Sequence, residues 1–178
     1  MRKTPRAALW LCSLLTAAWM CLIFWFSSRD ATESGNLSGS LLRGLLSFFW
    51  PGWELKSAAE QQHLFDSLHI VLRKCGHFSE FAVLGILLRL NLLQIPKLHT
   101  SCRQKPSFWN GFVLPALLAL FYAGTDEFHQ RFVPGRSCEL RDVCIDVCGA
   151  CTGLLLWIAA SALLRLIRNK LHRKKSAS

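Results

Sequence analysis

Apolar residues in this chain come in long blocks, without the short period that marks the buried face of a soluble strand or helix. A helix that crosses a bilayer needs about 20 predominantly apolar residues. The first block, Ala7–Phe26, carries no charged side chain. The pattern predicts an all-α integral membrane four-helix bundle with a single domain over residues 1–178. The predicted spans lie at about residues 7–26, 75–93, 108–129 and 142–164.

Lysine and arginine gather at three places along the chain. They precede the first block, occur in the connection between the second and third blocks, and dominate the tail 165–178. The connection over 27–73 has acids and bases in near balance. Because basic residues concentrate on the cytoplasmic side, we predict a multi-pass protein of the cell membrane with both termini in the cytoplasm. An even number of spans puts all three basic regions on that side, which supports the prediction of four.

The first extracytoplasmic connection contains two stretches that are too short or too polar to cross a membrane. Leu41–Trp53 is strongly apolar and is interrupted at Pro51-Gly52. Glu54–Arg73 has the pattern of an amphipathic helix. We therefore predict two short helices that lie flat on the outer membrane surface and are separated near Pro51-Gly52. The apolar face of the second comprises Leu64, Leu68 and Leu72.

The formal charge of +10 at neutral pH lies mainly in the predicted cytoplasmic flanks. No nucleic-acid motif accompanies the basic tail, so we expect no nucleic-acid partner. The lipid bilayer is the partner that the composition implies, and the tail is suited to anionic headgroups. Five of the eight cysteines lie inside predicted spans, and the chain is not expected to carry a disulfide framework. Near three of them, Gly149 and Gly153 form a small-xxx-small pattern that indicates a close helix approach.

Polar residues converge at one depth near the outer face. His77 and Glu80 lie about 5–9 Å inside the second span, and Asp126 follows about 27 Å after the start of the third. Asp142 and Asp146 open the fourth span, one turn apart. Helices that run in alternating directions thus bring their polar groups to the same membrane face. The predicted cluster comprises His77, Glu80, Asp126, Glu127, Gln130, Arg136, Asp142 and Asp146.

Several kinds of chemistry fit this predicted cluster. Carboxylates and imidazoles could bind a divalent metal or act as general acids and bases. Arg136 could bind a carboxylate or an anion through its planar fork. A structural alternative is that Lys74 and Arg136 pair with buried acids and hold the helices together. The chain contains no Ser-His-Asp signature, phosphate loop or HExxH motif, and no specific cofactor is predicted.

The chain resembles VanZ-like membrane proteins at these residues. The resemblance covers FWFSSRD after the first span, KCGHFSEFAVLG in the second, and YAGTDEFHQRFVPGRSCELRDVCIDVCGACTG across the last two. It implies one VanZ-like membrane domain. Phe81 stands where such proteins often have tyrosine, so a phenol is not expected to act there. The matching positions are Lys74, His77, Phe81, Asp126, Glu127, Gln130, Pro134, Gly135, Arg136, Asp142, Asp146 and Gly149.

The resemblance implies a bacterial cell-envelope protein, since the family is named for a protein linked to low-level resistance to the glycopeptide teicoplanin. Two function classes follow. The protein could bind a surface ligand, a lipid headgroup or a membrane partner and so modulate glycopeptide susceptibility. Alternatively, it could be a membrane-embedded enzyme that uses the His/carboxylate cluster on a lipid-linked or cell-wall substrate. A transporter fits less well, because four short helices leave little room for alternating access.

Overall fold

The structure, a computed structural model, describes residues 6–29, 42, 44–50, 52–95, 107–134, 136 and 138–176. These residues contain helices and turns and no strand, so the all-α prediction is confirmed. A short helix over 44–49 and the 3-10 turn η1 (Trp53–Leu55) precede the second long helix. The other elements are α1 (Arg6–Ser27), α3 (Ala58–Leu92), the π-helical turn η3 (Trp109–Val113), α4 (Leu114–Gln130) and α5 (Leu140–Ser176).

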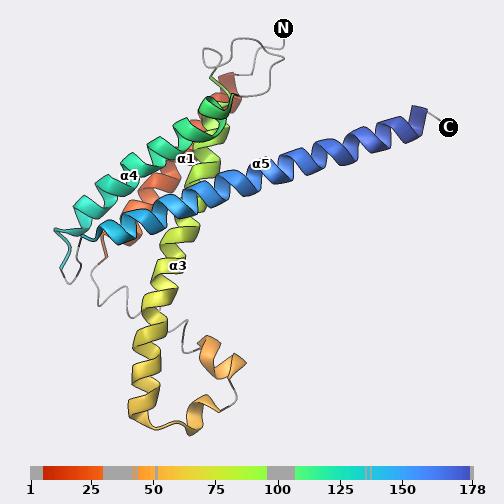
Figure 1. The fold of residues 1–178 in the computed structure, drawn as a ribbon. Helices are drawn as coiled ribbons and strands as arrows, with labels where there is room; N and C mark the ends of the chain where they lie inside the picture. Colours follow the sequence, from red (N-terminus) through yellow and green to blue (C-terminus); the bar gives the residue numbers. More distant parts are fainter. Residues whose placement is uncertain are drawn as a thin grey trace.

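Helices α1, α3 and α4 lie side by side, and α5 crosses them (Figure 1). The most extensive interface is between α3 and the first part of α5. The remainder of α5 projects away from the other helices, and its apolar side chains such as Leu163 and Leu166 are exposed. The helix continues through the predicted basic tail as far as Ser176. The predicted site residues Asp142 and Asp146 lie in the first turns of α5.

Three helices among the described residues are long and apolar enough to cross a membrane: Ala7–Ser27, Trp109–Gln130 and Leu140–Arg173. They coincide with the first, third and fourth predicted spans. By length and composition the chain is therefore a multi-pass membrane protein. The remaining predicted span, 75–93, lies in α3, where it continues from a more polar N-terminal half. Large apolar side chains on the outward faces, such as Trp10 and Phe121, are suited to lipid contact.

The prediction of a separate short helix over Glu54–Arg73 is wrong. Helix α3 begins at Ala58, where Ser57 and Glu60 form a reciprocal capping box, and it runs without a break to Leu92. No proline interrupts this stretch. Gly76 costs a helix only about 1 kcal/mol relative to alanine. The chain therefore continues directly from the connection after α1 into the predicted span.

Side chains from the segment before α3 cover the apolar face of its N-terminal half. Leu42, Leu46 and Trp53 form a small buried cluster. Phe48 and Phe49, in contrast, are 78% and 74% exposed. The interfacial position therefore remains a prediction for the 44–49 helix. The residues of α3 that pack on the buried cluster are Leu64, Phe65, Leu68 and Leu72.

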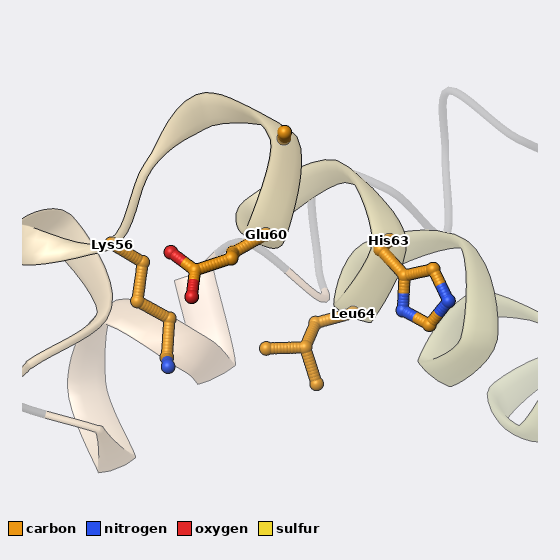
Figure 2. Close-up of a pocket in the computed structure, with 5 residues that line it drawn as sticks. Lys56, Glu60, His63 and Leu64 are labelled. Atoms are coloured by element: carbon orange, nitrogen blue, oxygen red, sulfur yellow. The ribbon is translucent and has the colours of Figure 1, made fainter.

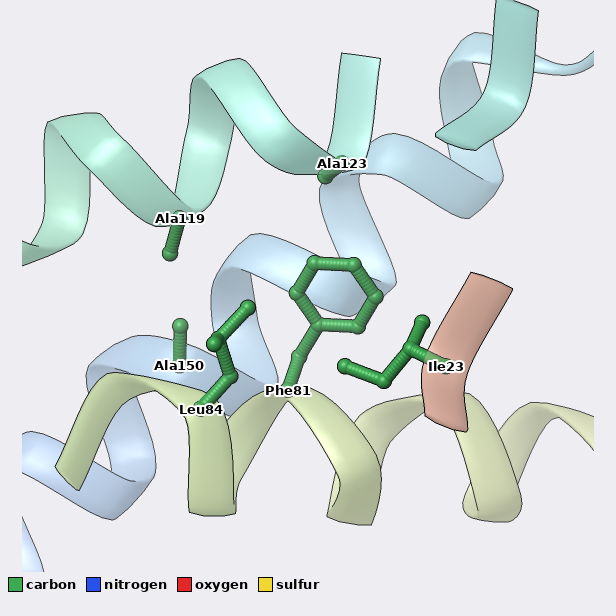
Figure 3. Packing of buried hydrophobic residues seen from close by; sticks show 6 residues of the cluster. All are labelled: Ile23, Phe81, Leu84, Ala119, Ala123 and Ala150. Carbon is green, nitrogen blue, oxygen red and sulfur yellow. The ribbon is translucent and has the colours of Figure 1, made fainter. Parts of the chain in front are cut away.

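The main core is small and lies where the four long helices meet (Figure 3). Phe81 is fully buried, with its ring 6.0 Å from that of Tyr122. This packing role accounts for an apolar ring at position 81. Tyr122 donates its hydroxyl to the Met20 carbonyl and thereby connects α4 to α1. The buried members of the core are Ile23, Phe81, Leu84, Ala119, Ala123 and Ala150.

Glycines allow α3 and α5 to approach until their backbones touch. A Cβ placed at Gly149 would lie 2.2 Å from the Phe78 carbonyl oxygen, and one at Gly153 would lie 2.1 Å from that of Ala82. Real Cβ atoms essentially never come this close, so the close approach predicted from the small-xxx-small pattern is confirmed. Gly149 is three residues from Asp146, and the same contact fixes the position of Asp146 against α3.

Candidate functional site

His77 of α3, Asp126 of α4 and Asp146 of α5 meet in the bundle. Each offers one ligand atom, and these atoms lie within 4.8 Å of one another. Asp126 and Asp146 are 2% and 1% exposed, whereas His77 is partly buried. The predicted convergence of these three side chains is confirmed. We call them the His/Asp cluster.

One side of the His/Asp cluster is held by polar residues from α1 and α4. Ser27 donates its hydroxyl to Asp126 Oδ2 at 2.9 Å. Gln130 Nε2 donates to Ser27 Oγ at 2.8 Å and to Asp126 Oδ2 at 3.3 Å. Sequence reasoning missed Ser27 as a member of the site. Its signal was a hydroxyl in the last turn of an otherwise apolar span, inside the FWFSSRD segment.

The other side of the cluster has buried polar atoms without hydrogen-bond partners among the described residues. They are His77 Nδ1, Asp126 Oδ1 and both carboxylate oxygens of Asp146. His77 Nδ1 lies 3.8 Å from Asp146 Oδ1, which is too far for a hydrogen bond. A buried polar atom left unpaired typically costs about 1–3 kcal/mol. The cluster therefore has buried donor and acceptor atoms that could bind a partner from outside the described side chains.

A small cavity opens next to the cluster. Its volume is about 10 Å³, close to the room that one water molecule needs. Lys74 Nζ forms an ion pair with Asp142 Oδ1 at its edge. The cavity thus joins the His/Asp cluster to a cationic rim. Its polar lining comprises Arg73, Lys74, His77, Gln130, Asp142 and Asp146.

The other residues predicted for the site lie around this centre and have separate contacts. Glu127 is buried and accepts the backbone N–H of Glu139 at 3.1 Å, which holds the connection between α4 and α5. Glu80 is half-buried and interacts electrostatically with Asp126 and Arg136. Asp142 is engaged by Lys74.

Arg136 does not form a carboxylate fork among the described residues. Its Nη2 donates to the Phe26 carbonyl at 3.5 Å, whereas Nε and Nη1 are buried without a hydrogen-bond partner there. His129, near the end of α4, contacts residues of α1 and the turn after it. Its ring packs 4.3 Å from that of Phe24, and its Nε2 is 3.2 Å from Ser28 Oγ.

A larger surface depression of about 310 Å³ lies at the start of α3 and is lined by Lys56, Glu60, His63 and Leu64 (Figure 2). Two of its polar groups, on Glu60 and Lys56, are already engaged. Hydrogen bonds from Ser57 lower the pKa of the Glu60 carboxyl below its usual value, and Lys56 Nζ lies 5.4 Å from the centre of the Trp50 ring. Local capping and packing account for this region, and the His/Asp cluster remains the candidate site.

Comparison with known proteins gives the family of the chain. No curated protein and no solved structure matches it. The description of the family that matches is VanZ/LLP1, and the match covers residues 12–165. That range includes most of α1, all of α3 and α4, and the first part of α5, with all three residues of the His/Asp cluster. The chain therefore belongs to the VanZ/LLP1 family.

Proposed function

We propose that this protein crosses the cell-envelope membrane four times and binds an envelope ligand at the His/Asp cluster. The ligand class is a surface ligand, a lipid headgroup or a membrane partner, and binding modulates susceptibility to teicoplanin-type glycopeptides. The observation that carries the proposal is the set of buried, unpaired oxygens on Asp126 and Asp146. A buried polar atom without a partner typically costs about 1–3 kcal/mol, which a bound ligand would offset.

The four-span topology requires that α3 also crosses the membrane, in addition to the three candidate spans. Its half from Cys75 onward is apolar and packs against the candidate spans α1, α4 and α5. With four crossings, the basic termini and the basic connection over 97–105 all lie in the cytoplasm. The His/Asp cluster then lies beneath the outer surface, within reach of an envelope ligand.

Cysteine labelling tests this topology. In a variant without its native cysteines, Glu60→Cys should react with a membrane-impermeant maleimide added outside intact cells. Gln104→Cys should react only after the membrane is opened. The reason is that residue 60 precedes the α3 crossing and residue 104 follows it. The reverse labelling pattern would contradict the proposed orientation, and equal labelling of both sites from outside would contradict a crossing by α3.

A purely structural role explains the Lys74–Asp142 pair, which links α3 to α5. It does not explain the two acids of the His/Asp cluster. Asp126 and Asp146, however, make no ion pair with a lysine or arginine among the described residues. Acids kept only to hold helices together would be expected to use their charge on a cation. This difference favours ligand binding at the His/Asp cluster.

An enzyme is the second candidate, and one observation favours it. His77 faces two buried carboxylates from other helices beside a cavity, an arrangement suited to general acid–base work. The substrate class would be a lipid-linked or cell-wall compound. Turnover of such a compound by purified protein would favour the enzyme, and saturable binding without turnover would favour the binding role.

Asp126→Asn tests the function itself. The expected result is loss of the glycopeptide phenotype at normal abundance of the protein in the membrane. An unchanged phenotype at normal abundance would contradict a working role for the cluster.

A further inference from the structure

We propose that the His/Asp cluster holds a first-row divalent metal ion of the Mn²⁺ or Zn²⁺ type. This inference rests on the proposed function and names an ion that the same site would hold. Three helices contribute one nitrogen and two carboxylate ligands within 4.8 Å. The 3.8 Å from His77 Nδ1 to Asp146 Oδ1 compares with about 3.4 Å for two ligands that each lie about 2.1 Å from one tetrahedral ion. The two atoms thus have a separation that an ion can bridge.

The pairing of the polar atoms also fits a metal. Asp126 turns one oxygen, Oδ2, to Ser27 and Gln130 and leaves Oδ1 unpaired. Asp146 has both oxygens unpaired at 1% exposure, and His77 has Nδ1 unpaired. Hydrogen bonds that orient a ligating carboxylate from behind are characteristic of metal sites. Ser27 and Gln130 thus act as positioning residues for Asp126.

Acidic groups surround Asp146. Asp126, Glu127, Asp142 and Glu80 all interact electrostatically with it. Neither Asp126 nor Asp146 makes an ion pair with a lysine or arginine among the described residues. A divalent ion between the two carboxylates would supply the positive charge that no such pair provides there.

The donor atoms indicate the class of ion. Mg²⁺ and Ca²⁺ prefer sites built from oxygen alone, whereas an imidazole together with carboxylates suits Zn²⁺, Mn²⁺ or Fe²⁺. Three protein ligands leave at least one coordination position open. The adjacent cavity, with room for about one water molecule, is where that position can be filled. Lys74 lies on the rim of the cavity, so an anionic group can approach the ion from that side.

Mn²⁺ binding to the full-length chain tests the inference. The protein is purified in detergent, stripped with a chelator and titrated with Mn²⁺, while the electron paramagnetic resonance signal of the free ion is followed. Mn²⁺ is the probe because the native thiolates prefer softer metals. We expect one tightly bound ion per chain. His77→Gln and Asp146→Asn should each weaken binding by about 100-fold or more, since even residues outside the metal's own ligands typically change affinity 10–100-fold.

Asp142→Asn is the matched control. It removes the same charge one helical turn from Asp146, at a residue engaged by Lys74. Asp142 bonds to none of the three proposed ligands among the described residues. Its substitution should therefore lower the affinity by no more than about 10-fold, the lower end of the effect of losing a ligand's hydrogen-bond partner. Absence of Mn²⁺ binding by wild-type protein, or equal binding by wild type and Asp146→Asn, would overturn the metal site. An equal loss in Asp142→Asn would also overturn it, because binding would then depend on general charge.

The result separates this inference from the proposed function. If no Mn²⁺ binds but Asp126→Asn still loses the phenotype at normal abundance, the metal inference fails and the ligand-binding function stands. If Mn²⁺ binds with the expected dependence on His77 and Asp146 but Asp126→Asn keeps the phenotype, the metal site stands and the proposed function fails.

Discussion

Asp126→Asn should abolish the glycopeptide phenotype that we propose for a host carrying this protein, with its abundance in the membrane nearly unchanged. Asparagine keeps an oxygen that can accept the Ser27 hydroxyl, now 2.9 Å from Oδ2. Because Asp126 makes no ion pair with a lysine or arginine among the described residues, its substitution leaves no such cation newly unpaired. The change therefore removes the charge on the unpaired side of the carboxyl while largely retaining the packing.

The measurement is paired: glycopeptide susceptibility of the host and protein level in the membrane fraction. Asp66→Asn is the control, since Asp66 is an exposed acid of α3 that accepts a hydrogen bond from Gln62, and it should change neither quantity. A low level together with a lost phenotype for Asp126→Asn would indicate a structural acid. A buried polar group that loses its hydrogen-bond partner costs about 1–3 kcal/mol, which is enough to lower abundance.

Gly153→Ala and Gly149→Ala should strongly destabilise the folded protein. The added methyl group would lie 2.1 Å or 2.2 Å from a backbone carbonyl oxygen of α3, and a backbone atom cannot move aside as the end of a side chain can. Overpacking of this kind costs typically about 1–3 kcal/mol, and we expect the upper end of that range. Because α5 must move away from α3, Asp146 should also leave the His/Asp cluster.

Gly76→Ala provides the matched control for both glycine variants. Gly76 lies inside α3, and a Cβ there would have no atom within 4 Å. Alanine should therefore gain up to about 1 kcal/mol from its higher helix propensity. The midpoint of thermal unfolding of the purified protein in detergent measures the stability of all three variants. A midpoint for Gly153→Ala at or above that of wild type would contradict the close crossing of α3 and α5.

The apolar blocks predict the long helices well, because a membrane span depends on composition over about 20 residues and little on neighbouring helices. Ala7–Phe26 and α1 agree to within a residue at each end. The outer connection is predicted less well. The amphipathic face of Leu64 and Leu68 is the same whether it meets lipid or the Leu42 and Trp53 side chains. Periodicity therefore indicates the helix and leaves its neighbour undetermined.

The residues of the candidate site also divide into those that the sequence predicts and those that it does not. His77, Asp126 and Asp146 could be predicted to converge because helix rise and direction fix depth in a bundle. Glu127 shares that depth, but it points to the connection before α5 and accepts the Glu139 N–H. Ser27 could be found only from contacts between helices. Depth follows from the sequence, whereas the direction of each side chain depends on how the helices rotate and cross.

A crystal structure of the full-length protein grown in lipid tests the central claim, that the His/Asp cluster binds a ligand, most directly. The account predicts electron density for an ion, or for part of a lipid headgroup, between His77 Nδ1 and the carboxylates of Asp126 and Asp146. The contradicting result is a closed cluster in which the three side chains bond directly to one another with no density between them, or one in which any of the three points into lipid.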